Sequence, residues 1–495
     1  MTDVVTTRDW LSALPTVLAA AVVVAQLAIV VAALGVIPGN RRPTTGMAWL
    51  LLILAVPFLG ILIFLLLGST HVERRRQDKQ RDVNATIHER TSAVAALTEP
   101  TPELAYVQSV AALNRNLGSL PAMAGNHVDL FPESDKAVAA MSDAIERAER
   151  FVHVEFFTTA WDDVTAPVFD ALVRATRRGV VVRLMLDHLG SRPIPGFKQL
   201  LQRLDGTDIE WRLMLPVQPL KGNFRRPDLR NHRKILVVDG LVGFTGSRNL
   251  IEPCYDKPEN QKIGRAWVDL LARMEGPVVA ALNAVFATDW YSETDQILGE
   301  EMLRPPDPNP TGGITCQVVP SGPGFVAENN LRMFTTLLYS AQHRISLTAP
   351  YFVPDESMLY AVTTAAQRGV AVELFVPEVG DQFMVHHAQR SYYEALLAAG
   401  VRIYLYPAPF VLHAKHFTID DDVAVLGSSN MDMRSFSLNY EVSVMLLGGD
   451  IVARMRAVED TYRGLSRELT ADEWAHRSRR SRYVDNVMRL TASLQ

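Results

Sequence analysis

Two octapeptides decide the fold of this chain: His232-Arg233-Lys234-Ile235-Leu236-Val237-Val238-Asp239 and His413-Ala414-Lys415-His416-Phe417-Thr418-Ile419-Asp420. Both have the pattern HxKxxxxD, and they lie 181 residues apart. The tetrapeptides Gly246-Ser247-Arg248-Asn249 and Gly427-Ser428-Ser429-Asn430 repeat the pattern GSxN at the same spacing of 181. One octapeptide could arise by chance. Two, each followed after the same gap by GSxN, indicate that the chain contains two similar halves.

A second repeat indicates what kind of halves these are. Residues 178–186 (RGVVVRLML) and, 190 residues later, residues 368–376 (RGVAVELFV) each suggest a helix end at glycine followed by an apolar, β-branched run. Such runs are typical of covered strands in α/β units. We therefore predict an α/β fold with two tandem domains, residues 106–304 and 314–495, separated at the proline-rich segment 305–313.

The N-terminus carries two long apolar runs. Val17 to Ile37 contains 21 residues and Met47 to Gly68 contains 22, and neither run contains a charge. An apolar helix of about 20 residues spans the hydrocarbon core of a bilayer. A signal peptide has an apolar region of only about 7–15 residues. We therefore predict a two-helix transmembrane hairpin over residues 1–72, followed by a polar linker over residues 73–105.

Basic residues give the expected orientation of this hairpin. Five of them follow the second run, whereas the connecting loop holds only Arg41 and Arg42, and Arg8 precedes the first run. The positive-inside rule then places both termini in the cytoplasm. We expect a multi-pass membrane protein whose large C-terminal part is cytoplasmic. The five basic residues are Arg74, Arg75, Arg76, Lys79 and Arg81.

Composition excludes several other classes of protein. Hydrophobic residues make up 48% of the chain and charged residues 21%, which excludes a disordered or collagenous chain. The formal charge of -5 and the lack of a broad basic stripe argue against nucleic-acid binding. The two cysteines, Cys254 and Cys316, form no CxxC pair, which argues against a cysteine-based zinc site and suits a reducing compartment.

The repeated motifs suit chemistry on a phosphodiester. Residues two apart on a strand share a face, so the histidine and lysine of each octapeptide should point together. Lysine ammonium and asparagine amide groups stabilise charge on phosphoryl oxygens. Packing the two halves face to face would gather both sets at one seam. We expect His232, Lys234, His413 and Lys415 to be catalytic, and Asn249 and Asn430 to bind the substrate.

A pair of histidines can divide the work of group transfer. One neutral imidazole attacks phosphorus to form a phosphohistidine, while the other, protonated, donates to the leaving alcohol and later deprotonates the acceptor. Because two lysines can neutralise the phosphoryl charge, we expect no metal and no cofactor. The sequence also lacks the HExxH pattern of a zinc hydrolase.

Four acidic residues accompany the motifs. Asp239 and Asp420 complete the octapeptides and are counted with the catalytic set. A regular strand would nevertheless turn them away from the histidine and lysine, which favours a structural role. Asp269 and Glu441 follow further along each half, and each is a candidate partner for the second ring nitrogen of a histidine.

At these residues the sequence resembles the phospholipase D superfamily, whose signature is a tandem HxKxxxxD followed by GSxN. Within it, the chain is similar to the bacterial cardiolipin synthases. APYFVPD (Ala349 to Asp355), SYYEALLAAGVRIYLY (Ser391 to Tyr406) and GSSNMDMRSFSLNYE (Gly427 to Glu441) add to this likeness. The resemblance implies an N-terminal membrane segment and two α/β domains that share one active site.

The resemblance also implies a reaction and its participants. Phosphatidylglycerol would give a phosphatidyl group to His232 with loss of glycerol, and a second phosphatidylglycerol would accept it. His413 would be the acid and base, and Asp269 and Glu441 would orient the histidines. The expected partners are phosphatidylglycerol, other anionic phospholipids and the lipid bilayer of a bacterial inner or plasma membrane.

The sequence leaves alternatives open. A membrane-bound phospholipase D would use the same residues with water as the acceptor. A catalytically inactive lipid-binding scaffold would belong to a different class, although intact histidine, lysine and asparagine in both halves argue against it. The acceptor could also be phosphatidylethanolamine or a free alcohol.

Overall fold

The computed structural model describes residues 7–37, 43–68, 78–79, 82, 85, 104–118, 120–218, 223–298, 312–325 and 328–492. The chain divides into two compact units, Met1–Arg74 and Arg75–Gln495. Three features predicted from the sequence fall largely outside the described residues. They are the basic cluster after the second apolar run (except Lys79), most of the polar linker, and the proline-rich segment up to residue 311.

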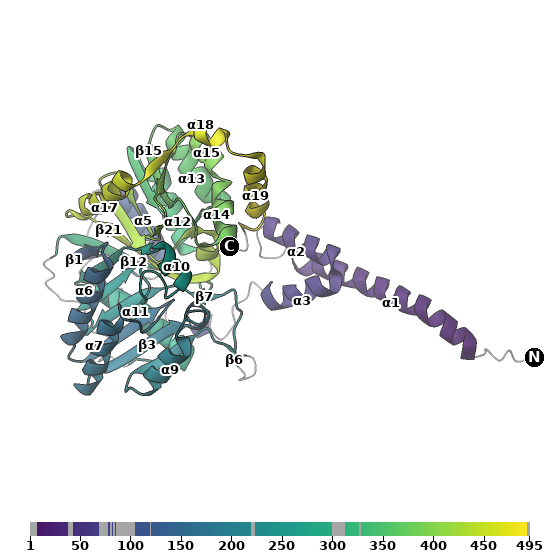
Figure 1. The fold of residues 1–495 in the computed structure, drawn as a ribbon, viewed down its shortest axis with the longest axis horizontal. Coiled ribbons are helices and arrows are strands. Elements are labelled where there is room, and N and C mark those ends of the chain that lie inside the picture. Colours follow the sequence, from purple (N-terminus) through teal and green to yellow (C-terminus); the bar gives the residue numbers. More distant parts are fainter. Residues whose placement is uncertain are drawn as a thin grey trace, which may run out of the picture. The chain divides into compact units, whose positions relative to one another are not determined.

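The N-terminal unit contains helix α1, Thr7–Val36 (Figure 1). Its stretch Leu18–Val36 carries no charged residue, and within the described residues it is the one helix long and apolar enough to cross a membrane. The first predicted crossing therefore has the length and composition that a bilayer requires.

The second apolar run does not form the single helix that its length predicted. It breaks at Val56, whose φ of -140° and ψ of 78° separate α2 (Pro43–Ala55) from α3 (Pro57–Leu67). Pro57 disfavours the helical conformation of the preceding residue. At about 1.5 Å per residue, neither helix reaches across a hydrocarbon core of about 30 Å. The predicted two-helix transmembrane hairpin is therefore not confirmed.

Glycine lets the two short helices pack against each other. A Cβ atom on Gly60 would lie 2.8 Å from the Cα of Ile53, so only glycine permits this approach of the backbones. Ile53 is buried together with Ala33 and Ile37 of the α1 end and with Phe64 of α3. The second apolar run thus folds back on itself and also packs on α1.

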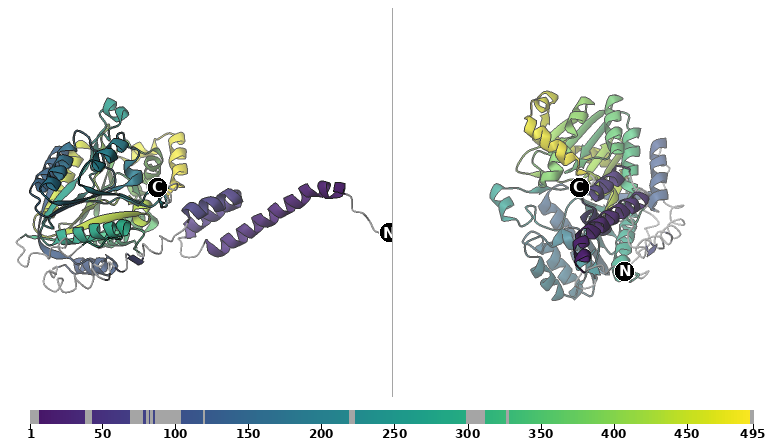
Figure 2. Two further views of the ribbon diagram at one scale, coloured as in Figure 1. Left: turned by 90° about the horizontal axis from the view of Figure 1, so that it is seen from below. Right: turned by 90° about the vertical axis from the view of Figure 1, so that its right-hand side faces the viewer.

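The larger unit is built on one mixed sheet with an internal symmetry. In the first half the order is β1-β11-β9-β8-β2-β3-β4, and in the second half it is β12-β21-β19-β18-β13-β15-β16, with β22 beyond β16. Antiparallel pairing of β1 with β12 joins the two halves into one sheet. The predicted α/β fold with two similar halves is therefore confirmed, and Figure 1 and the right-hand view of Figure 2 show one half above the other.

The bounds of the strands follow the repeat. Those of the first half are β1 Met123–Phe131, β2 Phe151–Phe156, β3 Val181–Asp187, β4 Glu210–Met214, β8 Lys234–Val238, β9 Val242–Gly246 and β11 Leu271–Glu275. Those of the second half are β12 Ile314–Ser321, β13 Arg344–Thr348, β15 Ala371–Pro377, β16 Arg402–Tyr406, β18 His416–Ile419, β19 Val423–Gly427, β21 Asn439–Leu447 and β22 Arg467–Leu469. Short strands outside this order are β5 Val217–Gln218, β6 Asn223–Phe224, β7 Arg230–Asn231, β10 Trp267–Val268, β14 Phe352–Val353, β17 Val411–Leu412 and β20 Met431–Asp432.

Helices cover both faces of the sheet. On one face, α6 and α7 bury apolar side chains against β2 and β3, and α12 and α13 do the same in the second half. On the other face, α11 and α17 share a single core that runs across both halves. This continuous core fixes the halves relative to each other, which a site built between them requires.

The bounds of these helices are as follows. The first half contains α6 Ser134–Glu146, α7 Ala166–Arg177, α8 His188–Ser191, α9 Phe197–Asp205, α10 Pro258–Ile263 and α11 Val278–Thr294. The second half contains α12 Asn329–Ser340, α13 Glu356–Gln367, α14 Phe383–Arg390, α15 Tyr393–Ala398, α16 Met433–Ser437, α17 Ile451–Leu465, α18 Ala471–Ala475 and α19 Arg479–Arg489.

Two local details concern the helix ends before the repeated strands and the first helix of the larger unit. The predicted helix ends are confirmed: Gly179 after α7 and Gly369 after α13 adopt φ of +88° and +93°, and buried strands follow both. Helix α5 (Ala105–Gly118) precedes the first half in sequence but packs Val107 and Val110 into the core of the second half.

Candidate active site

The histidine of each octapeptide lies in a short extended segment that is attached to a strand of the other half. The backbone N–H of His232 donates to the carbonyl of Tyr440 on β21 at 2.9 Å, and that of His413 donates to the carbonyl of Val268 on β10 at 2.7 Å. The residues just before each histidine form parallel pairs, β7 with β21 and β17 with β10. The two histidines are thus held at the seam between the halves.

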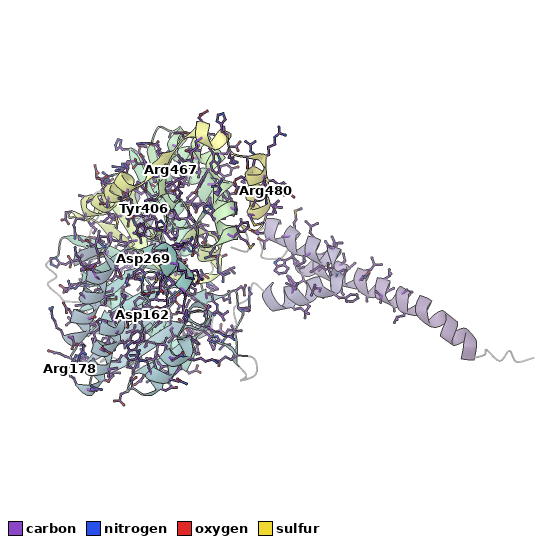
Figure 3. All side chains as sticks on the ribbon, in the orientation of Figure 1. Asp162, Arg178, Asp269, Tyr406, Arg467 and Arg480 are labelled. Carbon is purple, nitrogen blue, oxygen red and sulfur yellow. The ribbon has the colours of Figure 1, made fainter. Side chains whose placement is uncertain are left out.

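Each histidine is also partnered by a carboxylate from the other half. His232 Nδ1 lies 3.0 Å from both carboxylate oxygens of Glu441, and His413 Nδ1 lies 2.7 Å from Oδ1 of Asp269. Figure 3 shows Asp269 near the centre of the unit. Because Nδ1–H of each ring donates to the carboxylate, Nε2 is the ring nitrogen that can act on a substrate. The sequence identified both acids but did not predict that the halves exchange them.

The serine of each GSxN tetrapeptide holds one of these carboxylates, a role that the sequence analysis missed. Ser247 Oγ donates to Asp269 at 2.6 Å, and Ser428 Oγ donates to Glu441 at 2.5 Å. The repeated serine was a signal in itself, because its counterpart recurs at the same spacing in the second half. Each serine therefore fixes the acid that orients the histidine of the opposite half.

The two motif lysines have equivalent surroundings. Lys234 Nζ donates to the carbonyl of His232, and Lys415 Nζ donates to the carbonyl of His413, both at 2.6 Å. An ammonium has three donors, so each lysine keeps donors for a ligand. Both side chains are buried, which keeps water from screening the charge that they offer to an anion.

The two motif asparagines are both buried but differ in their contacts. Asn249 accepts a hydrogen bond from the backbone N–H of Thr158 at 3.3 Å and donates to the hydroxyl of Tyr255 at 2.7 Å. Asn430 Oδ1 makes no hydrogen bond to any residue that the structure describes. Tyr255, which no sequence motif marks, is a bulky residue at a φ of +61°, where strain is typical of functional sites.

Burial and neighbouring cations set the charge of the site. Desolvation, and then the nearby lysines, hold the pKa of His232 well below its usual value. Desolvation also lowers the pKa of His413, against the opposing effect of Asp269. Burial lowers the pKa of Lys234 to about 7 and that of Lys415 to about 8. A bound anion would reverse this trend, since it favours the charged ammonium forms.

The two orienting acids are not equivalent. Burial raises the pKa of Asp269, but His413 and Lys415 outweigh it, and the net pKa lies well below the usual value. Burial raises the pKa of Glu441 to about 7. Asp269 is therefore firmly ionised at neutral pH and raises the pKa of His413, although burial and Lys415 keep that pKa below its usual value in the empty site. Glu441 is more weakly ionised, which suits a neutral His232.

The aspartates that close the octapeptides lie at the far ends of the strands from the histidines. Asp239 accepts hydrogen bonds from the backbone N–H groups of residues 149, 150 and 151, each at 2.8 Å. Asp420 accepts from those of residues 342, 343 and 344, also at 2.8 Å. The site thus includes the histidines and lysines of the motifs but not Asp239 or Asp420, which tie down the turns before β2 and β13.

The donor set does not suggest a metal centre. In the described residues, no three histidine, cysteine or acidic side chains are grouped as a metal site requires. Positive charge at the seam comes instead from the two lysines. Histidines oriented by carboxylates, beside lysines and amides, form a site for nucleophilic attack on an ionised phosphodiester.

Two mixed α/β halves that share one histidine–lysine site define a phospholipase D-like protein. The family model "Cardiolipin synthase, PLD-like domain" matches residues 141–266 and again residues 334–460. A second model, "Phospholipase D-nuclease N-terminal", matches residues 27–69. The chain belongs to the cardiolipin synthases of the phospholipase D superfamily.

Full-length relatives agree with this assignment. The chain is 33% identical to cardiolipin synthase A of Erwinia tasmaniensis over 463 residues, covering 90% of this chain and 92% of that protein. It is 35% identical to cardiolipin synthase A of Serratia proteamaculans, with the same coverage, and 34% identical to that of Escherichia coli, covering 88% and 90%. The crystal structure of phosphatidylserine synthase of Haemophilus influenzae shares the fold, with a TM-score of 0.59 at 13% identity over 78% of this chain and 99% of that chain.

Proposed function

We propose that this enzyme transfers a phosphatidyl group from one phosphatidylglycerol to another through a phosphohistidine, releasing glycerol and forming cardiolipin. The observation that carries the proposal is the exchange of carboxylates between the halves, which holds both histidines at one seam with Nδ1 of each ring on a carboxylate. Cardiolipin synthase relatives over nine-tenths of the chain support the substrate and the product.

In the first step, Nε2 of His232 attacks the phosphorus of phosphatidylglycerol. A P–N bond forms and the P–O bond to glycerol breaks, while protonated His413 gives its proton to the departing glycerol oxygen. Lys234, Lys415, Asn249 and Asn430 bind the phosphoryl oxygens and stabilise the charge that builds on them.

In the second step, a hydroxyl of the glycerol group of another phosphatidylglycerol attacks the same phosphorus. His413, now neutral, takes the proton of that hydroxyl, the new P–O bond forms and the P–N bond to His232 breaks. Both histidines return to their starting states, so the cycle consumes no other reactant.

The surroundings of the histidines support this division of roles. His413 pairs with Asp269, which is ionised and stabilises an imidazolium, so His413 suits the acid. His232 pairs with Glu441, whose raised pKa suits a neutral ring and hence the nucleophile. Asp269 and Glu441 orient the rings, and Asp239 and Asp420 have structural roles.

Location follows from the N-terminal unit and from the chemistry of the substrate. We place the protein in the plasma membrane of a bacterium with its catalytic halves in the cytoplasm, because basic residues follow the second apolar run. A second crossing stays a prediction, since α1 is the one described helix long enough to span. Topology reporters fused to each terminus will read the same side if there are two crossings and opposite sides if there is one.

A lipid assay tests the proposed reaction. The purified protein is reconstituted with phosphatidylglycerol and a chelator, and cardiolipin, phosphatidic acid and glycerol are followed together. We expect cardiolipin and an equal amount of glycerol, and neither product from His232→Ala. Phosphatidic acid as the main product would identify a hydrolase, and no product from any phospholipid would favour an inactive lipid-binding scaffold.

A further inference from the structure

The C-terminal helix α19 presents apolar side chains on the outside of the protein. Tyr483 is 71% exposed and Leu490 is 83% exposed. Leu490 caps the C-terminal end of α19 seven residues after Tyr483, and the half-buried Val487 lies between them on the same side. The opposite side carries Asp485, which is fully buried. The inner side also carries Met488, which packs against the core of the second half, so α19 has apolar side chains on both its inner and its outer side.

Polar contacts explain how α19 is held in this orientation. Asp485 accepts from Nδ1 of His387 at 2.7 Å and from Nε of Arg390 at 3.3 Å, and Arg390 also donates to Ser481. Arg390 and Arg477 both lie over the ring of Trp474, at 4.9 and 4.1 Å from its centroid. The inner side of α19 is therefore fixed to α14 and α18, and its outer side is exposed and can contact an external partner.

Helix α14 extends the exposed apolar surface. Phe383 is 65% exposed and Met384 is 43% exposed, at the start of α14. The ring of Phe383 lies 4.4 Å from the ring of His387, which bonds to Asp485 of α19, so the exposed start of α14 lies beside α19. The surface formed by Phe383, Met384, Tyr483, Val487 and Leu490 is hereafter the α14–α19 face.

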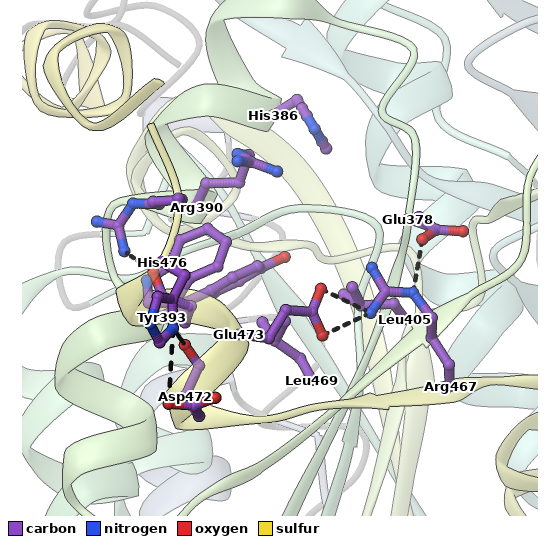
Figure 4. A pocket seen from close by; sticks show the side chains of 12 residues that line it. Glu378, His386, Arg390, Tyr393, Leu405, Arg467, Leu469, Asp472, Glu473 and His476 are labelled. Atoms are coloured by element: carbon purple, nitrogen blue, oxygen red, sulfur yellow. Dashed lines mark hydrogen bonds and ion pairs between the residues drawn. The ribbon is translucent and has the colours of Figure 1, made fainter. Parts of the chain in front are cut away.

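Arginines border the α14–α19 face. Arg479, Arg480 and Arg482 are exposed, and no ion pair within the described residues holds any of them (Figure 3 shows Arg480). By contrast, Arg467 in the neighbouring cavity of about 480 Å³ is paired with Glu378 and Glu473 (Figure 4). The positive charge on α19 is thus available to an external partner, whereas the charge inside the cavity is not.

We propose that the α14–α19 face docks the catalytic unit onto an anionic lipid surface. Guanidinium groups bind lipid phosphates, and tyrosine and leucine side chains on the same helix suit the boundary between headgroups and acyl chains. A second copy of the chain fits less well, because a two-fold contact through this face would bring arginines against arginines. The inference goes beyond the proposed reaction, since it concerns how the catalytic halves meet the bilayer.

Labelling of the full-length protein tests the contact directly. Leu490→Cys in a Cys254→Ser background is labelled with a fluorescent dye and reconstituted into vesicles that contain phosphatidylglycerol and a lipid with a quencher on its acyl chain. Leu465→Cys is the matched control, because Leu465 is a 54% exposed leucine on α17, away from the α14–α19 face. We expect quenching to be at least about threefold stronger at residue 490 than at residue 465. Equal quenching at the two positions would overturn the proposal.

A charge-reversal variant gives a second readout. Arg479→Glu, Arg480→Glu and Arg482→Glu together should lower turnover on vesicles rich in phosphatidylglycerol by at least about tenfold, because each surface cation adds to the attraction for an anionic surface. Turnover of soluble, short-chain phosphatidylglycerol should not change, which also shows that the variant is folded. Equal loss with both substrates would contradict docking. The dye does not depend on turnover, so it stays informative if the proposed reaction is wrong.

Discussion

Exchange of carboxylates between the halves makes a specific prediction for Asp269→Asn. Asp269 belongs to the first half but contacts His413 of the second, through a 2.7 Å bond in a site where both side chains are less than 10% exposed. The amide keeps the size of the side chain and removes its charge, so His413 loses the group that stabilises its protonated form. Replacing the buried aspartate of a serine-protease triad in this way costs about 10⁴-fold. We expect a loss of roughly 10³–10⁴-fold here, which corresponds to about 4–5.5 kcal/mol at 1.36 kcal/mol per decade.

The choice of donor reveals which histidine is damaged. Glycerol needs a proton to leave, whereas nitrophenolate leaves without one, so a phosphatidyl nitrophenyl ester bypasses the acid. General acid catalysis contributes about 10²–10⁴-fold. The nitrophenolate burst of Asp269→Asn should recover by roughly that factor relative to its rate with phosphatidylglycerol. Glu441→Gln is the matched control and should not recover, because its partner is the nucleophile His232.

Rescue of Glu441→Gln but not of Asp269→Asn would refute this assignment of the two acids. If each acid served the histidine of its own half, the activated ester would rescue Glu441→Gln and leave Asp269→Asn slow. Equal rescue of both variants would also contradict the assignment, because it would mean that neither acid is tied to the nucleophile. Stopped-flow absorbance of the first turnover separates these outcomes, since release of the phosphatidyl group from His232 does not contribute to the burst.

Three further predictions follow from the same contacts. Asp239→Asn should lower the free energy of unfolding by roughly 2–4 kcal/mol through its three backbone hydrogen bonds, with little change in activity per folded molecule. Thermal unfolding checks this against Asp472→Asn, an 88% exposed control. The pKa values of Lys234 and Lys415 are about 7 and 8 in the empty site, so kcat/KM should fall as pH rises through 7–8. The kcat should persist to higher pH, because a bound phosphodiester favours the ammonium forms. Parallel pH profiles of kcat/KM and kcat would contradict this prediction. Because the pKa of Lys234 falls from 10.5 to about 7 on folding, the unfolded chain binds more protons between those values. Stability should therefore rise with pH across that window, and Lys234→Met should raise the Tm at pH 7 and flatten the rise.

The sequence predicted the site wherever a repeat carried the information. Identical spacing of HxK and GSxN in both halves placed two histidines and two lysines together, and the odd number of positions to Asp239 favoured a structural role for it. Spacing could not reveal that Asp269 and Glu441 cross the seam. The order of residues in the sequence is the same whether each acid pairs with the histidine of its own half or of the other half. Only the β7–β21 and β10–β17 contacts distinguish the two arrangements.

The length of the second apolar run did not predict its structure. Its 22 uncharged positions satisfied the length of a crossing, but that count ignores what Pro57 does to Val56 and what Gly60 permits at Ile53. Composition likewise could not foresee the α14–α19 face. The arginines and the apolar stripe of α19 are recognisable in sequence, but their exposure depends on the burial of Asp485 against His387 and Arg390.

Trapping the covalent intermediate tests the central claim most directly. In His413→Ala the base that activates the acceptor is missing, so a phosphatidyl nitrophenyl ester should load the enzyme and leave it loaded. Peptide mass spectrometry should then find the phosphatidyl group on His232 and on no other residue, and His232→Ala should remain unmodified. A phosphatidyl group on another residue, or release of nitrophenolate with no adduct at all, would contradict transfer through His232.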